Sequence, residues 1–253
     1  MPIAVIRSVP AIALAAALAI AAGGCSSSRS GYTGSIGSSA GANLSQVEKA
    51  YRARPDEPRM ALAYAERLKE SGDTKTSQAV LMRAAVVTPD DPGVLSALGR
   101  GMLESGDAGA ALTTLNKARA AGANDWRTLS ALGTAHDMSD EHDQAQKVYR
   151  DALKQAPDEP AIASNYGLSL ALSGKLSEAE TMLRTAAAKR GADEKVRQNL
   201  ALVLGLQGKF KEAEQVATAD LPPEKAAENV AYMRQMLSQD DRWKAIKAGD
   251  KKS

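Results

Sequence analysis

Between Leu44 and Asp220, residues of the same type recur every 34 positions without an insertion. One recurring column holds Gly four times and Asp once. Because Gly tolerates the positive φ that often ends a helix, and Asp tolerates it better than most other residues, this column predicts a turn inside each repeat. The column consists of Gly72, Gly106, Asp140, Gly174 and Gly208.

A second column, 17 residues further on, predicts the turn between repeats. An acidic residue follows it by two positions, and we expect that residue to cap the next helix. Proline often takes the first helical position, where no backbone amide needs an acceptor. The turn column is Pro55, Pro89, Ala123, Pro157 and Gly191, the acids are Glu57, Asp91, Asp125, Glu159 and Asp193, and the prolines are Pro58, Pro92 and Pro160.

Between the turns, small residues alternate with larger ones at helical spacing. Two helices of a hairpin interlock when small residues on one helix face large residues on the other. The pattern therefore predicts a stack of helical hairpins with one common packing scheme. The first helices carry Ala65, Gly99, Gly133, Gly167 and Ala201, and the second helices carry Leu81, Leu115, Tyr149 and Leu183.

These columns resemble those of the tetratricopeptide repeat, although the usual aromatic residue near the start of the first helix is largely missing. The resemblance implies an all-α fold, a right-handed tetratricopeptide-repeat superhelix of about five helical hairpins followed by a capping helix. The expected array spans 43–221, with a half repeat at 43–57 and full repeats at 58–91, 92–125, 126–159, 160–193 and 194–221.

Residues 222–240 are predicted to form the capping helix. A proline pair ends the repeat pattern at Pro222, and an amphipathic stretch follows. A terminal repeat needs a helix to cover its apolar side, which gives this stretch its role. The remaining residues, 241–253, are predicted to be a polar tail. The apolar face of the helix holds Ala226, Val230, Met233 and Leu237.

Composition agrees with helices and excludes some partners. Hydrophobic residues make up 44% of the chain but aromatic residues only 4%, and Ala and Leu favour helices over strands. The 32 basic and 30 acidic residues nearly balance, so nothing in the charge indicates nucleic acid or an acidic substrate.

Residues 1–24 are predicted to be a lipoprotein signal peptide. A short basic segment precedes an apolar stretch from Ile12 to Ala22, which is short for a membrane span of about 20 residues. The chain has a single cysteine, Cys25, so an internal disulfide is excluded.

The sequence Ala22-Gly23-Gly24-Cys25 resembles the bacterial lipobox, although Leu is usual where Ala22 stands. The resemblance implies that Cys25 carries lipid, and that Ser26 directs the protein to the outer membrane, facing the periplasm. Residues 25–42, rich in Ser and Gly, would then be a flexible tether. The alternative is a secreted chain with a free thiol at Cys25.

Candidate catalytic and metal-binding residues are few. His136 lies in a column of Leu and Met, which favours a buried or half-buried histidine. His142 lies among acidic residues in a predicted turn, which favours a solvated run of charge. No nucleophile motif or phosphate loop is present. We therefore expect no enzyme activity, cofactor, metal or small-molecule substrate.

A concave surface lined by the first helices is the expected binding site. Its lining changes from charged residues in the first repeats to leucine in the last two. Exposed leucines in a concavity indicate a docking site for a partner segment, whereas the competing interpretation is that the capping helix or the tail covers them. The leucines are Leu168, Leu172, Leu202 and Leu206.

Asn165, Lys195 and Asn199 resemble part of the carboxylate clamp of chaperone-binding repeat domains. The resemblance is incomplete, because Ser130 and Thr134 stand where the clamp has Lys and Asn. The clamp also has Arg where this chain has Asn199. These three residues complete the predicted protein-binding site.

The segments 199–214, 220–223 and 229–237, together with the lipobox, tether and repeats, resemble the TadD family. Members are tetratricopeptide lipoproteins of the tight-adherence (Flp) pilus machinery. The resemblance implies an accessory role in pilus assembly, pilotin-like toward the outer-membrane secretin, with protein segments of that assembly as partners. The alternatives are another envelope assembly, such as a type IV pilotin or a barrel-insertion accessory, and an accessory of polysaccharide or peptidoglycan synthesis.

Overall fold

The computed structural model describes residues 43–239 of the 253-residue chain. These residues all belong to one compact unit. The predicted signal peptide, Cys25, the tether and the polar tail all lie outside the described residues. Within the described residues every regular element is an α-helix, which confirms the all-α prediction.

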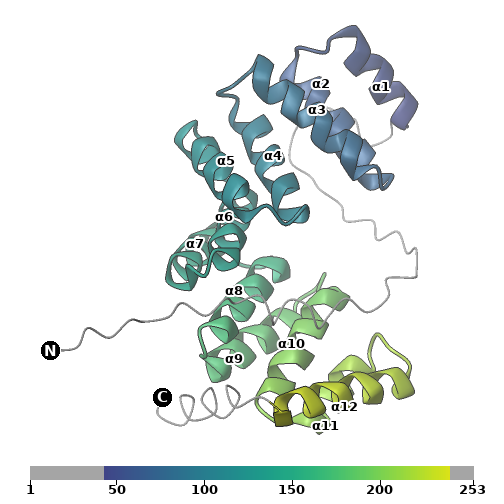
Figure 1. Cartoon of the computed structure of the whole chain (residues 1–253), viewed down its shortest axis with the longest axis vertical. Helices are drawn as coiled ribbons and strands as arrows, with labels where there is room; N and C mark the ends of the chain where they lie inside the picture. Colours follow the sequence, from purple (N-terminus) through teal and green to yellow (C-terminus); the bar gives the residue numbers. More distant parts are fainter. Residues whose placement is uncertain (1–42, 240–253) are drawn as a thin grey trace, which may run out of the picture. The chain divides into compact units, whose positions relative to one another are not determined.

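Twelve helices follow one another in the described part of the chain, joined by short turns (Figure 1). They are α1 (Leu44–Ala53), α2 (Pro58–Glu70), α3 (Thr74–Val87), α4 (Pro92–Glu104), α5 (Ala108–Ala120), α6 (Trp126–Met138), α7 (His142–Gln155), α8 (Pro160–Leu172), α9 (Leu176–Ala187), α10 (Glu194–Leu206), α11 (Phe210–Ala217) and α12 (Pro223–Gln239).

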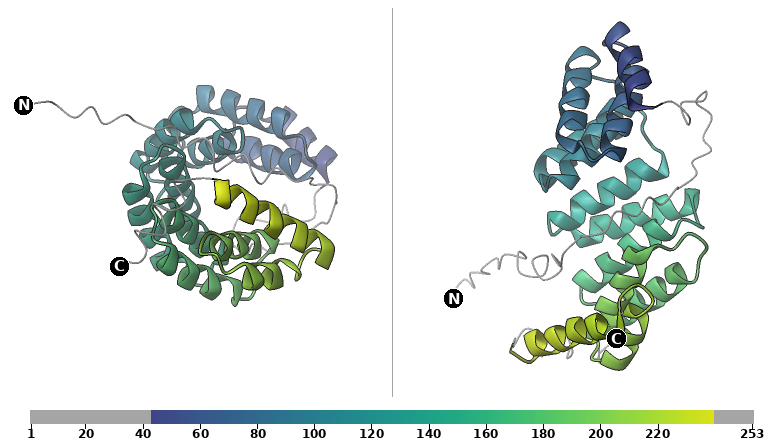
Figure 2. Two further views of the ribbon diagram at one scale, coloured as in Figure 1. Left: turned by 60° about the horizontal axis from the view of Figure 1, so that its bottom comes forward. Right: turned by 90° about the vertical axis from the view of Figure 1, so that its right-hand side faces the viewer.

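Five hairpins form the array, each from an even-numbered first helix and the odd-numbered helix that follows it, from α2/α3 to α10/α11. The first helix of each hairpin also contacts the first helix of the next, whereas the second helices show no comparable contact among the described elements. The stack therefore curves with its first helices on the inner, concave side, and Figure 2 shows the curl. The predicted tetratricopeptide superhelix is confirmed.

The turns inside the repeats have the backbone conformation that the sequence predicts. Gly72, Gly106, Gly174 and Gly208 all have φ between 79° and 86°. Asp140 takes the same place in the third repeat with φ of 59°, and no other non-glycine residue described has positive φ. Asp is among the residues that tolerate this region best, so the third turn closes without glycine.

Glycine on the first helix lets the second helix approach closely. A Cβ atom at Gly99, Gly133 or Gly167 would lie 2.6–2.7 Å from the side chain of Leu115, Tyr149 or Leu183, respectively. Leu115 and Leu183 are fully buried, and Tyr149 is 1% exposed. The small and large columns therefore interlock as predicted. Each large side chain of the second helix fills the space that a Cβ on the facing glycine would need.

The acidic residues before the first helices do not all act as caps. Asp91 accepts a hydrogen bond from the backbone N–H of Val94, and Asp193 accepts one from Val196. Glu57 and Glu159 make no such bond, so the capping prediction is wrong for both. The shorter Asp side chain reaches the amides of the first turn better than Glu does, in keeping with the preference for Asp at this position.

Helix α12 packs on the last repeat and occupies the place of a further first helix, because it contacts both α11 and α10. Ala226 and Val230 are buried on its inner face. A Cβ at Gly205 of α10 would overlap Met233, so this glycine lets α12 approach closely. Among the described helices none is long and apolar enough to span a membrane.

Candidate functional site

The predicted leucines lie on α8 and α10, two neighbouring first helices on the concave side of the stack. Leu172 is exposed, with 39% of its surface accessible, and Leu168 and Leu202 are half-buried. Leu206 is only 8% exposed, on the helix that α12 contacts. The prediction of an exposed leucine is therefore wrong for Leu206, because this residue lies in the packed end of the last repeat.

Two of the three predicted polar site residues connect neighbouring repeats. The amide nitrogen of Asn199 donates to Ser164 Oγ at 3.0 Å, and that of Asn165 donates to Ser130 Oγ at 3.4 Å. Both bonds bridge residues 35 positions apart, so they form a ladder along the first helices. Lys195 is exposed at the start of α10. In the predicted clamp, therefore, the side-chain amides of Asn165 and Asn199 already donate to serine hydroxyls of the preceding repeat.

The first two repeats have a different lining. Lys69 of α2 forms an ion pair with Glu104 of α4, and both side chains are about half exposed, at 47% and 46%. Arg67 pairs with Glu70 at 2.5 Å along α2. At this end of the stack, an ion pair joins neighbouring first helices. At the other end, hydrogen bonds from asparagine side chains join them.

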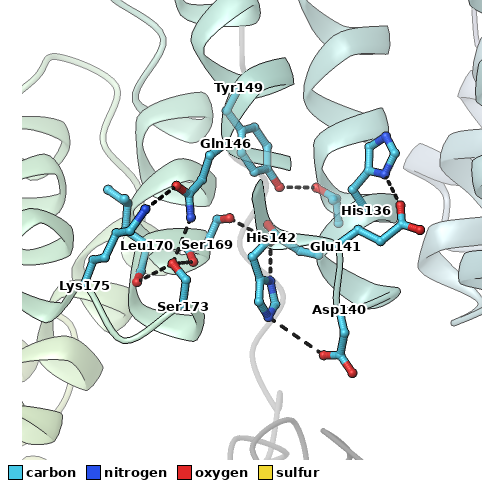
Figure 3. Close-up of polar contacts among 12 residues, drawn as sticks. His136, Asp140, Glu141, His142, Gln146, Tyr149, Ser169, Leu170, Ser173 and Lys175 are labelled. Atoms are coloured by element: carbon cyan, nitrogen blue, oxygen red, sulfur yellow. Dashed lines mark hydrogen bonds and ion pairs between the residues drawn. The ribbon is translucent and has the colours of Figure 1, made fainter. Parts of the chain in front are cut away.

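A polar cluster joins the third and fourth repeats (Figure 3). The Asp137 carboxylate at the end of α6 accepts hydrogen bonds from Ser169 Oγ of α8 at 2.7 Å and pairs with His142 Nδ1 at 2.9 Å. Burial raises the pKa of Asp137 above its ordinary value, although the bonds from His142 and Ser169 act in the opposite direction. Burial likewise raises the pKa of Tyr149, whose hydroxyl lies 3.1 Å from Thr134 Oγ1.

The prediction that His142 belongs to a solvated run of charge is wrong. Its side chain is 20% exposed because it begins α7 and turns toward Asp137. His136 is half-buried, as predicted, and its Nδ1 lies 2.6 Å from Glu141. Across residues 43–239 no group of three His, Cys, Asp or Glu side chains is arranged to hold a metal ion.

A second set of hydrogen bonds extends the cluster toward α9. Gln146 of α7 donates to Ser173 Oγ at 2.8 Å and accepts from Lys175 Nζ at 3.1 Å (Figure 3). Sequence reasoning missed this cluster. Ser169 stands in a column with Arg67, Gly101, Ala135 and Val203, and a column without a common residue type gave no signal.

Comparison with known proteins agrees with the geometry of the stack. A family model for the tetratricopeptide repeat matches residues 92–117, which is most of the second hairpin. The array has the tetratricopeptide-repeat fold. Repeats of this kind serve as scaffolds for protein–protein interaction. A comparison with curated proteins gave no match.

Solved structures of tetratricopeptide proteins superpose on much of the chain. A thermophilic protein of Thermus thermophilus is 23% identical, with 69% of this chain and 97% of that chain covered and a TM-score of 0.59. A protein from Parabacteroides merdae is 11% identical, with coverages of 75% and 76% and a TM-score of 0.60. YrrB, described as having an unusual peptide-binding site, is 15% identical, with coverages of 83% and 100% and a TM-score of 0.51. At these identities the likeness establishes the fold alone.

Proposed function

We propose that this protein is a lipid-anchored scaffold of the cell envelope that holds a segment of a partner protein on α8 and α10. The partner belongs to the assembly of a tight-adherence (Flp) pilus, in which this chain acts as a pilotin-like accessory of the outer-membrane secretin. The lipobox at Cys25, the Ser- and Gly-rich tether and the TadD resemblance support the anchor and the assembly. No catalytic step is assigned to the repeats.

The observation that carries the binding role is the apolar lining of the last repeats. Leu172 is 39% exposed on the concave side, and Leu168 and Leu202 lie half-buried on the same two helices. Apolar side chains that converge in a concavity gain free energy when a partner removes them from water. The peptide-binding site named for YrrB, on a similar fold, is in keeping with such an occupant.

A photoreactive amino acid in place of Leu172 tests the binding role directly. In the native host, irradiation is expected to cross-link this position to a secretin or another pilus-assembly protein, which mass spectrometry identifies. The matched control carries the same amino acid at Thr181, an exposed residue on the second helix of that repeat. Cross-linking only to polysaccharide or peptidoglycan synthases would contradict the pilus assignment, and equal cross-linking from Thr181 would contradict the concave site.

The anchor requires a separate test. Cys25→Ser removes the only thiol to which lipid could be attached. The protein should therefore leave the membrane fraction, and piliation should fall. Fractionation of the envelope followed by immunoblotting measures the first effect, and pilus counts measure the second. Membrane retention equal to that of the unmodified protein would contradict lipidation at Cys25.

A further inference from the structure

Three large apolar side chains are exposed together on α3, the second helix of the first hairpin. Met82 is 52% exposed, Val86 81% and Val87 42%. Met82 and Val86 are four positions apart and therefore lie on one face of the helix, with Val87 beside them. Single exposed apolar residues are common on protein surfaces, but a cluster of them usually marks a contact. We call these three residues the α3 face.

The repeat does not require apolar residues at these positions. The core side of α3 consists of Ser77, Val80, Leu81 and Ala84, which are all buried. In each of the next three hairpins, the positions equivalent to the α3 face hold alanine or a polar residue and are exposed or half-buried. They are Asn116, Ala120 and Ala121, then Arg150, Lys154 and Gln155, then Arg184, Ala188 and Lys189. The α3 face therefore belongs to the convex outer surface and not to the packing of the stack.

Helix α3 carries basic residues but no acidic ones. Its charged residues are Lys75 and Arg83, and both are exposed. Arg83 lies 3.5 Å from Asp56, in the turn between α1 and α2. An apolar face with basic residues beside it is typical of helices that lie on a membrane. The apolar side chains enter the boundary of the acyl chains, and the basic groups stay among the lipid headgroups.

The α3 face is too small for a stable protein interface. Such interfaces take about 20 residues from each partner. On α5, the neighbouring second helix, the same positions hold Asn116 and Ala120, so the apolar surface ends at α3. A second copy of this chain would therefore gain little apolar contact here. A bilayer to which the chain is already tied needs less area, because the anchor keeps the two surfaces at a high effective concentration.

The position of α3 along the chain also favours lipid. Seventeen residues separate Cys25 from Asn43, which caps α1. A flexible chain of that length has a root-mean-square span of about 20 to 25 Å. Because α1 packs on α2 and α2 packs on α3, the α3 face lies close to the start of the array. Tyr232 and Met236, the exposed apolar pair on α12, lie at the other end of the stack.

We infer that the α3 face rests on the bilayer in which Cys25 is anchored, an inference that rests on the anchor of the proposed function. Met82 and Val86 then lie at the boundary between headgroups and acyl chains, with Arg83 among the headgroups. Because α3 is a second helix, this contact leaves the concave side, which the first helices line, open to a partner. The α3 face thus sets the orientation of the array on the membrane.

Photo-cross-linking identifies what covers the α3 face. A photoreactive amino acid replaces Val86, and the lipoprotein is purified from the envelope of the native host and reconstituted in vesicles of phosphatidylcholine and phosphatidylglycerol. The matched control carries the same amino acid at Ala188, the equivalent exposed position of the fourth hairpin. Mass spectrometry should find phospholipid attached at position 86 at least about five times as often as at position 188, because the anchor holds α3 nearest the lipid.

Two kinds of result would overturn the inference. Cross-links mainly between two copies of this chain would show that a second copy covers the α3 face. Lipid adducts that are absent at position 86, or equally frequent at positions 86 and 188, would show that α3 makes no specific contact with the bilayer.

Substitution of the other two residues of the α3 face tests its apolar character. Met82→Asn and Val87→Ala together introduce the residue types of the second hairpin at exposed positions, and circular dichroism checks that the chain still folds. With the photoreactive amino acid kept at position 86, the yield of lipid adduct should fall at least about threefold, because binding scales with buried apolar area. Met236→Asn, on the 47% exposed side chain of α12, is the control and should leave the yield unchanged. An unchanged yield in the folded double variant would overturn the inference.

Failure of this inference is distinguishable from failure of the proposed function. The mass of the peptide that contains Cys25 shows whether lipid is attached there. An acylated Cys25 without lipid adducts at position 86 would refute the contact of the α3 face and retain the anchor. An unmodified Cys25 would refute the anchor and this inference with it. Cross-linking from Leu172 tests the partner site independently of both.

Discussion

The concave lining of α2 and α4 and that of α8 and α10 rest on the same backbone and the same 34-residue register, yet their chemistry is opposite. In the first pair, Lys69 and Glu104 connect neighbouring helices through exposed charges. In the second pair, Asn199 and Ser164 connect them through an amide, beside an exposed Leu172. The core columns set the repeat, whereas the residue types in the concave columns differ between the two ends.

The largest expected effect is a difference in stability between two leucine variants, one at a buried position and one at an exposed position of α8 and α10. Leu206→Ala should lower the free energy of unfolding by about 2 to 4 kcal/mol, because Leu206 is only 8% exposed and its truncation leaves a cavity. Leu172→Ala, at 39% exposure, should cost less than about 1 kcal/mol. Urea unfolding followed by circular dichroism measures both. Equal losses would mean that Leu172 belongs to the core.

The next largest effect tests whether the hairpins of the second and fourth repeats pack in the same way. Gly99→Ala in the second repeat and Gly167→Ala in the fourth should each cost about 1 to 3 kcal/mol, because the new Cβ meets Leu115 or Leu183. Gly101→Ala is the matched control on α4, where a Cβ meets nothing within 4 Å, and it should gain up to about 1 kcal/mol. Costs that differ widely between the two repeats would show that the hairpins do not pack alike.

The two ends of α6, between the compared regions, should respond oppositely to pH. The pKa of Asp137 is raised, so its carboxylate costs the folded state stability as pH rises from about 3.8 through the raised value. The pKa of Asp125 is lowered, so its carboxylate adds stability above about 3.8 and loses that effect as pH falls through the lowered value.

Asp137→Asn should therefore gain stability relative to the unmodified protein when pH rises from about 4 to about 7. Asp125→Asn should instead gain stability relative to the unmodified protein as pH falls below about 3.8, where the unmodified protein loses the contribution of the Asp125 carboxylate. Chemical unfolding of the two variants and the unmodified protein below about pH 3.8, at about pH 4 and at about pH 7 gives the comparison. A shift of the same sign in both variants would contradict the opposite environments.

The smallest effect concerns the links between neighbouring first helices. Lys69→Ala should cost about 0.5 kcal/mol or less, and salt should abolish that cost because the pair with Glu104 is exposed. Asn199→Ala should cost about 1 kcal/mol through the lost bond to Ser164, with no dependence on salt. Thermal unfolding at low and high salt distinguishes them, and a salt-dependent loss for Asn199 would remove the contrast.

Much of the fold could be predicted from particular residues. The glycine column predicted the turns because positive φ is a property of single residues, and it located even Asp140 in the third repeat. The pairing of Gly133 with Tyr149 followed from spacing because both residues lie in one hairpin. The caps were predicted less well, since Glu159 has the charge but not the reach of Asp.

The candidate site was harder to predict. The sequence placed four leucines on the concave side, but packing at the last repeat buries Leu206. It also gave no reason to expect that Ser169 would donate to Asp137, 32 positions away. Such contacts depend on how far one repeat is rotated against the next.

The sequence by itself determined the helical repeats, their turns and the interlocking columns of each hairpin, because those interactions join residues close together along the chain. Only the tertiary structure decided which polar groups of neighbouring repeats meet and which leucines remain accessible. The physical reason is that side-chain orientation and the curvature of the stack together set distances between repeats, and residue type alone fixes neither.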